Sequence, residues 1–273
     1  MENTIIIKMT PVDVTRCGFF SCCSMALYNL MDYINKTKIL PDIIDRSDYF
    51  VMYKDDPSRD ITYDYFKKES DVDEKMIKYP VCFYFDLQYN DYKRMNTENL
   101  QPILKKFFTP NDKVMKIKKT LIEKYSIDPD NTIACYFRGT DKFHEVHDLG
   151  KVEDYVKITN KIISDGKKMK ILLLSDSQKF IDEFLNLSNH TSIIISENKT
   201  SKNSCAIHKG NTKKQNHEEI YFLFATYLII ADCKHFVCNS CNGSLWTMLY
   251  RNNSDNIYQY SKSKWLFPET FEL

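Results

Sequence analysis

The sequence predicts an α/β protein whose C-terminal half is a Rossmann-like domain with a five-stranded parallel sheet. From residue 132 onward, short apolar runs of strand composition alternate with helical patterns, and polar residues follow most of these runs. Continuous apolar runs are typical of parallel strands that are buried on both faces. The regular alternation of strands and helices favours a parallel sheet that helices cover on both sides.

Length and composition agree with two closely packed domains. The chain has 273 residues, of which 43% are hydrophobic, and this is enough for a substantial core. We expect the boundary in the polar stretch 125–131. A smaller N-terminal α/β domain would then cover 1–128, and the Rossmann-like domain would cover 129–273.

Charge, cysteine usage and hydropathy argue against several classes of protein. The 38 basic and 37 acidic side chains give a net charge of +1, so general binding to nucleic acids or anionic membranes has no support. The nine cysteines lack zinc-binding spacing and fit reduced thiols in a cytosol-like compartment. We see neither a signal peptide nor an apolar run of the ~18 residues that a membrane helix needs. The expected location is the cytoplasm.

The first half carries both helix and strand signals. Apolar residues recur every three to four positions in 21–34, which is the spacing of a helix that buries one face. A second helix is expected over 111–125, just after Pro110, because proline is tolerated ahead of a helix. The other elements expected here are strands at 4–9, 38–41, 48–53 and 81–85 and helices at 61–68 and 97–107.

The second half alternates more regularly. The five expected strands lie at 132–137, 170–175, 193–195, 235–238 and 256–260. The elements expected between them are helices at 151–165, 177–187, 218–230 and 243–250, with a polar loop at 197–216.

Polar side chains follow three of these strands, in the stretches 138–142, 175–177 and 239–244. The carboxyl ends of parallel strands meet at one edge of a sheet, and ligands bind there. Arg138 and Lys142 supply cations for a diphosphate, and small hydroxyl-bearing residues at a helix start can bind phosphate. The chain has neither a GxGxxG turn nor a Walker lysine loop, which disfavours an ordinary NAD enzyme or P-loop NTPase. The set predicts a nucleotide diphosphate held by side chains.

Three peptides carry a family resemblance. The stretch 136–142 resembles the HxRxxDK peptide of the fucosyltransferase superfamily, which includes the core α1,6-fucosyltransferases, the rhizobial NodZ enzymes and the protein O-fucosyltransferases. The stretch 172–177 resembles a strand of that family that ends in an aspartate turn. The stretch 231–240 resembles a family segment that begins Ala-Asp and ends in a serine before a helix. The three match in order and spacing over roughly 130–255.

The resemblance implies a GT-B-like fold, with two Rossmann-like domains facing a cleft. It also implies inverting, metal-independent transfer of fucose from GDP-fucose to a hydroxyl of a glycan or protein acceptor, with no cofactor beyond this donor substrate. Arg138 would act in catalysis by holding the diphosphate and stabilising the departing GDP. The residues implied around the nucleotide are Tyr136, Arg138, Asp141, Lys142, Asp176, Asp232, Asn239, Ser240 and Ser244.

The chain departs from the family at the position of the catalytic base. The family's proposed base is a glutamate four residues after the lysine, where this chain has Val146. Glu145 stands one position earlier and is the base that we expect. The alternatives nearby are His144, His147 and Asp148.

Purely structural roles are alternatives for several of these residues. Arg138 and Asp141 could form an ion pair that closes the edge of the sheet. Asp176 could cap the following helix, and Asp232 could be an ordinary helix-end residue. Tyr136 stands where the family has a histidine and is of a type that is most often buried in a core.

Three other functions stay open at this stage. The chain could use another nucleotide sugar, or it could be a non-catalytic nucleotide- or sugar-binding relative, an alternative that the displaced glutamate keeps open. A metal-dependent GT-A enzyme would need an Asp-x-Asp pair just after a strand. Neither 71–73 nor 128–130 has that placement, which disfavours this alternative.

Overall fold

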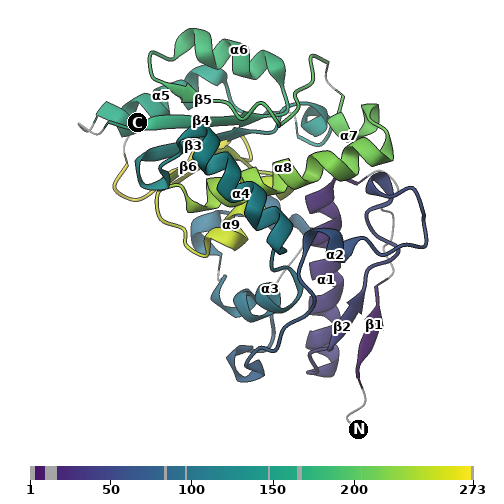
Figure 1. Cartoon of the computed structure of the whole chain (residues 1–273). Helices are drawn as coiled ribbons and strands as arrows, with labels where there is room; N and C mark the ends of the chain where they lie inside the picture. The colour runs from purple at the N-terminus through teal and green to yellow at the C-terminus, as the bar shows by residue number, and fades with distance from the viewer. Residues whose placement is uncertain are drawn as a thin grey trace.

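The computed structural model describes residues 4–9, 17–82, 85–95, 97–146, 148–164, 168–203 and 205–271. Its main sheet has the strand order β5-β4-β3-β6-β7-β8 (Figure 1). The first five strands in this order are parallel, and β8 pairs with β7 in the antiparallel direction. The strands are β3 (Thr132–Phe137), β4 (Lys170–Ser175), β5 (Ser192–Ile193), β6 (His235–Asn239), β7 (Ile257–Ser261) and β8 (Lys264–Leu266).

The strand order places β3 and β6 side by side at the point where the winding of the sheet reverses. The chain runs outward from β3 to β4 and β5, then crosses back to β6 and continues to β7. In doubly wound sheets, ligands bind outside the carboxyl ends of the strands at this switch point. The residues that follow β3 and β6 are therefore the first place to look for a site.

Helices cover both faces of this sheet (Figure 1). Ile133, Cys135 and Phe137 of β3 pack against α5 and α6, whereas Ala134 and Tyr136 face the opposite side with α8 and α9. This alternation is the two-residue period of a strand that is buried on both faces. The helices packed around the main sheet are α4 (Asp112–Tyr125), which precedes the expected domain boundary and packs on α8, and α5 (Val152–Ser164), α6 (Gln178–Leu187), α7 (Ile207–Gly210), α8 (Lys213–Asp232) and α9 (Asn242–Arg251).

The N-terminal half is smaller and holds a two-stranded parallel sheet of β1 (Ile6–Lys8) and β2 (Ile43–Asp45). Its buried apolar side chains and those of α8 and α9 form one continuous cluster. Trp246 of α9 also donates through Nε1 to Ser24 Oγ of α1, at 2.9 Å. The two halves therefore share a hydrophobic core. The remaining elements are α1 (Phe19–Thr37), α2 (Thr62–Tyr65), α3 (Gln101–Phe107) and the 3-10 turns η1 (Val51–Tyr53), η2 (Glu74–Met76), η3 (Phe85–Tyr89), η4 (Tyr92–Arg94), η5 (Glu98–Leu100), η6 (Pro129–Asn131) and η7 (Asp141–His144).

Two strand predictions in the first half are wrong. Residues 38–41 are irregular, because Lys38 adopts a left-handed conformation with φ of 60° and ends α1. The range 48–53 ends in the turn η1, and Phe50 in front of it also has a positive φ, of 59°. A left-handed residue interrupts an extended strand, and neither lysine nor phenylalanine signals one in a sequence.

The strand expected at 81–85 is not formed by its described residues. Residues 81 and 82 are irregular and Phe85 begins η3, while 83 and 84 lie outside the described residues.

In the second half the expected parallel strands and the helices between them are present, with four differences. β5 is shorter than expected. The stretch expected as a loop contains α7, and α8 begins early because Thr212 and Gln215 form a capping box. β8 was not expected, because its two-residue turn is made by Lys262 and Ser263, with φ of 50° and 60°, rather than by Asn-Gly or Asp-Gly.

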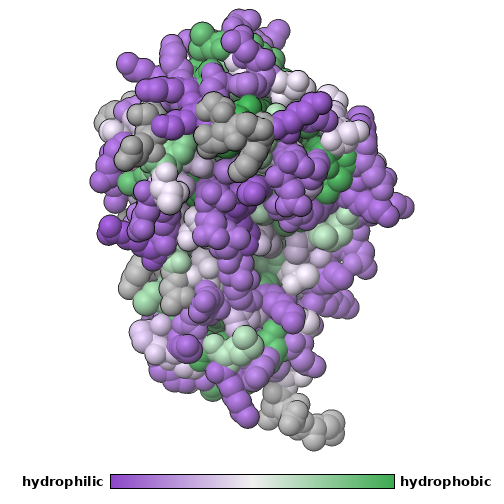
Figure 2. Space-filling model, turned by 90° about the vertical axis from the view of Figure 1, so that its left-hand side faces the viewer, coloured by the Kyte–Doolittle hydropathy of each residue, from purple (hydrophilic) through white to green (hydrophobic). Residues whose placement is uncertain are grey.

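The surface of the molecule indicates little more about function. Hydrophilic residues dominate the face shown in Figure 2, and hydrophobic residues lie there in small scattered groups. None of the described helices is long and apolar enough to cross a membrane. Most of the nine cysteines are buried, among them Cys135, Cys233 and Cys238.

Candidate functional site

Arg138 lies at the switch point, directly after β3, and Asn239 at the end of β6 holds its backbone. The Arg138 N–H donates to Asn239 Oδ1, and Asn239 Nδ2 donates to the Arg138 carbonyl, both at 2.9 Å. The amide side chain thus continues the ladder between the two strands by one step. It fixes the point from which the arginine side chain leaves the sheet.

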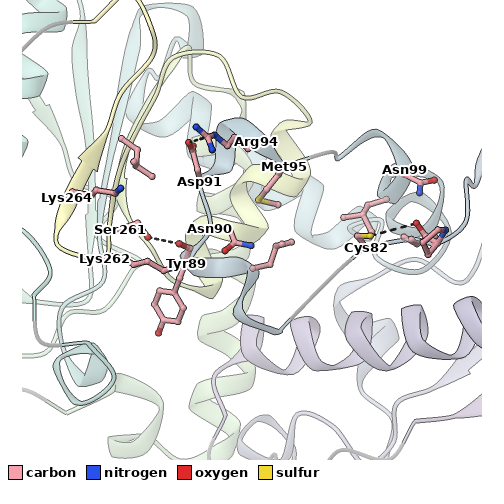
Figure 3. Close-up of a pocket in the computed structure, with 15 residues that line it drawn as sticks. Cys82, Tyr89, Asn90, Asp91, Arg94, Met95, Asn99, Ser261, Lys262 and Lys264 are labelled. Atoms are coloured by element: carbon pink, nitrogen blue, oxygen red, sulfur yellow. Dashed lines mark hydrogen bonds and ion pairs between the residues drawn. The ribbon is translucent and has the colours of Figure 1, made fainter.

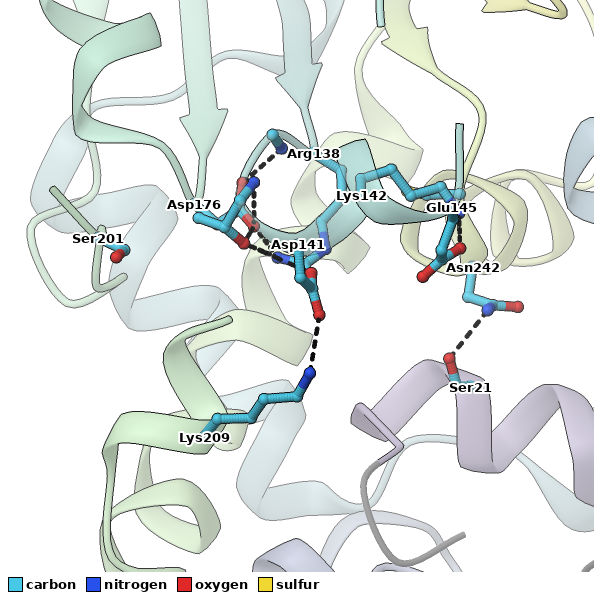
Figure 4. A network of polar contacts seen from close by, with 12 residues as sticks. Ser21, Arg138, Asp141, Lys142, Glu145, Asp176, Ser201, Lys209 and Asn242 are labelled. Carbon is cyan, nitrogen blue, oxygen red and sulfur yellow. Dashed lines mark hydrogen bonds and ion pairs between the residues drawn. The ribbon is translucent and has the colours of Figure 1, made fainter. Parts of the chain in front are cut away.

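Two carboxylates hold the guanidinium of Arg138. Asp141 and Asp176 both pair with it, and Thr140 Oγ1 accepts a further hydrogen bond at 2.9 Å. Asp176 also accepts from the Gly139 N–H at 2.7 Å, so the loop after β3 wraps around this carboxylate (Figure 4). Burial by itself would lower the pKa of Arg138, but neighbouring groups, among them the Asp141 carboxylate, outweigh this effect and the net pKa is raised. The guanidinium is therefore a fixed, oriented cation.

A cavity of about 320 Å³ lies over this loop and is lined by both halves of the chain. Gly18, Phe19 and Tyr53 come from the N-terminal half, and Arg138 and Asp176 come from the C-terminal half. Its size is at the lower end of the range that small-molecule ligands occupy. We refer to it below as the donor cavity, after the donor substrate that the family resemblance implies.

A second cation, the buried Lys142, lines the same cavity. Its Nζ donates to Glu145 Oε2 at 2.5 Å, to Tyr89 Oη at 2.9 Å and to Gln88 Oε1 at 3.2 Å. Burial would lower the pKa of Lys142, but neighbouring groups, among them its hydrogen-bond partners Glu145 and Tyr89, outweigh this effect, so the net pKa is raised. Lys142 is thus held in its charged form, with a carboxylate in direct contact.

The turn η7 explains how a glutamate three residues after the lysine can reach it. The Glu145 N–H donates to the Lys142 carbonyl at 2.9 Å, which closes a single 3-10 turn. Residues three apart lie on the same side of such a turn. Tyr89 donates to the same carboxylate oxygen, at 3.1 Å, and burial raises the pKa of Tyr89, so this hydroxyl keeps its proton. Glu145 is therefore oriented from two sides.

The other three candidates for a base have different placements. His144 is exposed and does not line the donor cavity. Asp148 accepts a hydrogen bond from Tyr260 and another from the Gly150 N–H at 2.9 Å, and it too lies outside the donor cavity. His147 lies outside the described residues.

The structure brings six of the expected site residues to the donor cavity. They are Tyr136, Arg138, Asp141, Lys142, Glu145 and Asp176. Tyr136 is buried and accepts a hydrogen bond from Tyr227 Oη at 2.7 Å, so it forms part of the floor. Gly243 packs on this pair, because a Cβ there would come within 2.5 Å of the Tyr227 hydroxyl oxygen.

Asp232 does not belong to this group, and its expected place near the nucleotide is corrected. It ends α8, just before β6 begins, whereas the site lies after the carboxyl end of β6. It pairs there with Lys118 at 2.5 Å. Asp232 and the donor cavity are therefore at opposite edges of the sheet.

Asn239, Ser240 and Ser244 are buried and do not line the donor cavity, although Asn239 and Ser240 line a neighbouring cavity together with Glu145. Their expected contacts with a nucleotide stay a prediction, and in the structure they make supporting contacts. Asn239 positions Arg138, as described above. Ser240 Oγ accepts from Gln259 Nε2 at 2.8 Å, and Ser244 Oγ accepts from the Cys241 N–H at the start of α9 at 2.9 Å.

Several residues at the cavity were not expected from the sequence. Lys209 of α7 points its ammonium toward Asp141, with Nζ 3.7 Å from Oδ2 (Figure 4). Asn242 at the start of α9 donates to Ser21 Oγ of α1 at 2.9 Å and joins the two halves at the rim. Basic residues in the polar stretch 197–216 were the only available signal for Lys209. Nothing in the sequence indicates a role for Tyr89, because its hydrogen-bond partners Glu145 and Lys142 lie more than 50 residues away along the chain.

A Rossmann-like sheet that faces a smaller α/β half across a ligand-sized cavity is the arrangement of a GT-B-like fold, as expected. The expectation of a second Rossmann-like domain is corrected, because the described residues of the first half form only the two-stranded sheet β1-β2. Solved structures identify the architecture further. NodZ α-1,6-fucosyltransferase soaked with GDP-fucose matches with a TM-score of 0.59 and 13% sequence identity, over 96% of this chain and 98% of that chain. NodZ co-crystallised with GDP matches with a TM-score of 0.53 and 11% identity, over 94% of each chain. Fucosyltransferase NodZ from Bradyrhizobium matches with a TM-score of 0.53 and 12% identity, over 93% of this chain and 94% of that one.

The chain therefore has a fucosyltransferase-like fold of the NodZ type. No protein-family model and no curated protein sequence matches it. Within the described residues, no group of three or more His, Cys, Asp or Glu side chains is placed to hold a metal ion.

Proposed function

We propose that this chain is a fucosyltransferase that moves fucose from GDP-fucose to a hydroxyl of a glycan or protein acceptor, with inversion and without a metal ion. The observation that carries the proposal is that Arg138, Lys142 and Glu145 line one cavity between the two halves of a NodZ-like fold. An anion-binding arginine and an oriented carboxylate are the two groups that this reaction requires.

Arg138 acts on the leaving group in this proposal. The bond between fucose C1 and the β-phosphate oxygen breaks, its electron pair goes to that oxygen, and GDP departs. The guanidinium stabilises the charge that develops there, and because Asp141 and Asp176 already hold it, it needs no reorganisation at the moment of reaction. Lys209 adds a cation from the opposite wall.

Glu145 acts on the acceptor. It takes the proton of the attacking hydroxyl while the acceptor oxygen forms its bond to C1 on the face opposite the departing GDP. Lys142 and Tyr89 bind the same oxygen, Oε2, and fix the carboxylate at the cavity wall. General bases positioned in this way contribute rate factors of about 10² to 10⁴.

A thermal-shift panel of GDP, UDP, CDP and their sugars, with and without a chelator, tests the proposal. We expect GDP and GDP-fucose to raise the melting temperature, by the same amount in the presence of chelator, because a ligand that binds only the folded state stabilises it. Stabilisation by UDP-sugars alone, or only with a divalent ion, would contradict the proposal. A chain that binds GDP but releases none from GDP-fucose with any acceptor would be a non-catalytic relative.

A further inference from the structure

One buried amide, the side chain of Asn216 near the start of α8, joins three segments around the donor cavity. Its Nδ2 donates to the Met52 carbonyl of η1 at 2.9 Å and to the His208 carbonyl of α7 at 2.7 Å. Its Oδ1 accepts from Asn211 Nδ2 at 3.1 Å. Asn216 is 3% exposed and lines the cavity. Both of its amide hydrogens are therefore used, one for each half of the chain.

Each of the two carbonyls belongs to a segment that lines the donor cavity. Tyr53, the residue after Met52, lines it from the N-terminal half, and Lys209, the residue after His208, lines it from α7. None of the four residues of α7 is buried, so apolar packing contributes little to holding this short helix in place. The hydrogen bonds of Asn216 therefore tie α7 to the N-terminal half.

Lys209 has the loosest ion pair among the lysines that line the donor cavity. Lys142 and Lys199 each lie within 2.6 Å of a glutamate oxygen, whereas Lys209 Nζ is 3.7 Å from Asp141 Oδ2 (Figure 4). The side chain of Lys209 is also 47% exposed. An exposed pair at this distance contributes little to stability, so the ammonium can turn to an anion in the cavity at little cost.

The placement of Asp141 shows which anion this ammonium can reach. Its Oδ1 pairs with Arg138 Nη2, and its Oδ2 is the oxygen nearest to Lys209. A single carboxylate thus spans the gap between the two cations. A nucleoside diphosphate carries its charge on two neighbouring phosphates, so Arg138 and Lys209 can bind one diphosphate together.

We infer that Asn216 is a positioning residue for the nucleotide: it holds α7 against the N-terminal half and so places Lys209 within reach of the diphosphate that Arg138 binds. The inference rests on the proposed function. Asn216 spends both amide hydrogens on backbone carbonyls, so it acts through α7 and not on the phosphates. The affinity for GDP then depends on how the two halves pack against each other.

A double-mutant cycle on the binding of GDP, measured by isothermal titration, tests the inference. The proteins are wild type, Lys209→Met, Asn216→Ala and the double variant. Effects of residues that act as a unit do not add in free energy, whereas independent effects do. Asn216→Asp is included because it keeps the size of the side chain but cannot donate to either carbonyl. A melting curve for each variant checks that it folds.

Asn111→Ala is the matched control for Asn216→Ala. Asn111 Nδ2 also donates to two carbonyls, that of Tyr63 at 3.2 Å and that of Asp64 at 2.7 Å, but this residue does not line the donor cavity. Its replacement removes the same number of hydrogen bonds to the backbone without releasing α7.

Arg94→Met is the matched control for Lys209→Met. Arg94 has a similarly long ion pair, with Nε 3.5 Å from Asp91 Oδ2 (Figure 3). It lines a separate cavity of about 670 Å³ between the segment 80–100 and the β7–β8 hairpin. Among the described residues, none lines both this cavity and the donor cavity. The control therefore removes one positive charge at a distance from the proposed diphosphate site.

We expect Lys209→Met to raise the Kd for GDP about tenfold and both Asn216 variants to raise it about five- to tenfold. The double variant should lie within about twofold of Lys209→Met, because Asn216 acts through Lys209. The two controls should bind GDP as wild type does.

Three results would overturn the inference. The first is independent effects, which would multiply to about 50- to 100-fold in the double variant. The second is a wild-type Kd in a folded Lys209→Met protein or in a folded Asn216 variant. The third is an equal loss in the matched controls. Wild type still binds GDP in each of these cases, and the proposed function stands. If wild type does not bind GDP, the proposed function fails as well.

Discussion

Glu145 Oε2 lies 2.5 Å from Lys142 Nζ, although the glutamate stands only three residues after the lysine. The 3-10 turn η7 makes this contact possible, and Tyr89 from the other half of the chain completes it. Glu145, which stands one position earlier than the family's proposed base, therefore has two defined partners, Lys142 and Tyr89. This pair is the part of the site on which the proposed chemistry depends most.

Replacing Glu145 with glutamine tests the base. Glutamine keeps the size of the side chain but cannot take a proton, so we expect transfer to fall by about 10² to 10⁴. The Kd for GDP should stay within about twofold, because the nucleotide does not need this proton acceptor. Steady-state transfer and isothermal titration measure the two quantities. Asp148→Asn is the companion variant: a larger loss there than in Glu145→Gln would assign the base to Asp148.

The Asn239 side chain holds the backbone of Arg138 through two hydrogen bonds. Asn239→Ala should therefore weaken GDP binding indirectly, through the position of Arg138. Each lost hydrogen bond contributes about 1 kcal/mol, and part of that loss appears as a poorly positioned guanidinium. We expect the Kd for GDP to rise about tenfold.

Asp232→Asn is the control for that titration, because Asp232 lies at the opposite edge of the sheet. Its Kd should equal that of wild type. If Asp232→Asn raised the Kd for GDP as much as Asn239→Ala does, the nucleotide would bind near Asp232. That result would contradict a site at the carboxyl end of β6.

The raised pKa of Lys142 predicts how its contribution depends on pH. A lysine whose folded pKa is raised is charged at every pH below its ordinary value of about 10.4, and its contribution is lost only as the pH rises through the folded pKa. The ratio of wild-type to Lys142→Met transfer rates should therefore be constant between about pH 7 and about pH 9. Rate profiles for the two proteins measure it. A ratio that declines toward one across this range would mean that Lys142 loses its proton there.

Gly243 is predicted to be intolerant of a methyl group. A Cβ at this position would lie 2.5 Å from the Tyr227 hydroxyl oxygen and 2.9 Å from that of Tyr136, and both side chains are buried. We expect Gly243→Ala to lower the free energy of unfolding by about 1 to 3 kcal/mol, as overpacking does. Denaturant titration measures it, with Gly210→Ala as the control, because nothing lies within 4 Å of a Cβ there. Equal stability of the two variants would contradict the packing described for the cavity floor.

Much of the second half could be predicted from the sequence, because its strands are continuous apolar runs whose ends are polar. Arg138 and Asp176 were found because parallel topology brings the residues after β3 and β4 to one edge. Asp232 was misplaced because the peptide that carries it spans all of β6. At roughly 3.3 Å per residue, the two ends of such a strand lie at opposite edges of the sheet.

The rest could not be predicted, for physical reasons. Tyr89 lies in an irregular 3-10 segment, and its role exists only when the two halves pack together. Phe50 and Lys38 adopt left-handed conformations that their residue types rarely favour. The turn at Lys262 and Ser263 is set by its pairing with neighbouring strands rather than by turn-forming residues.

The most direct test of the central claim is isothermal titration of GDP into wild type and Arg138→Ala. If Arg138 holds the diphosphate, the loss of its charge-assisted hydrogen bonds should raise the Kd about 10- to 100-fold. The melting curves of the two proteins, compared first, show whether the variant is folded. We expect this loss of GDP affinity in a folded Arg138→Ala variant. A folded Arg138→Ala protein that binds GDP within twofold of wild type would contradict it.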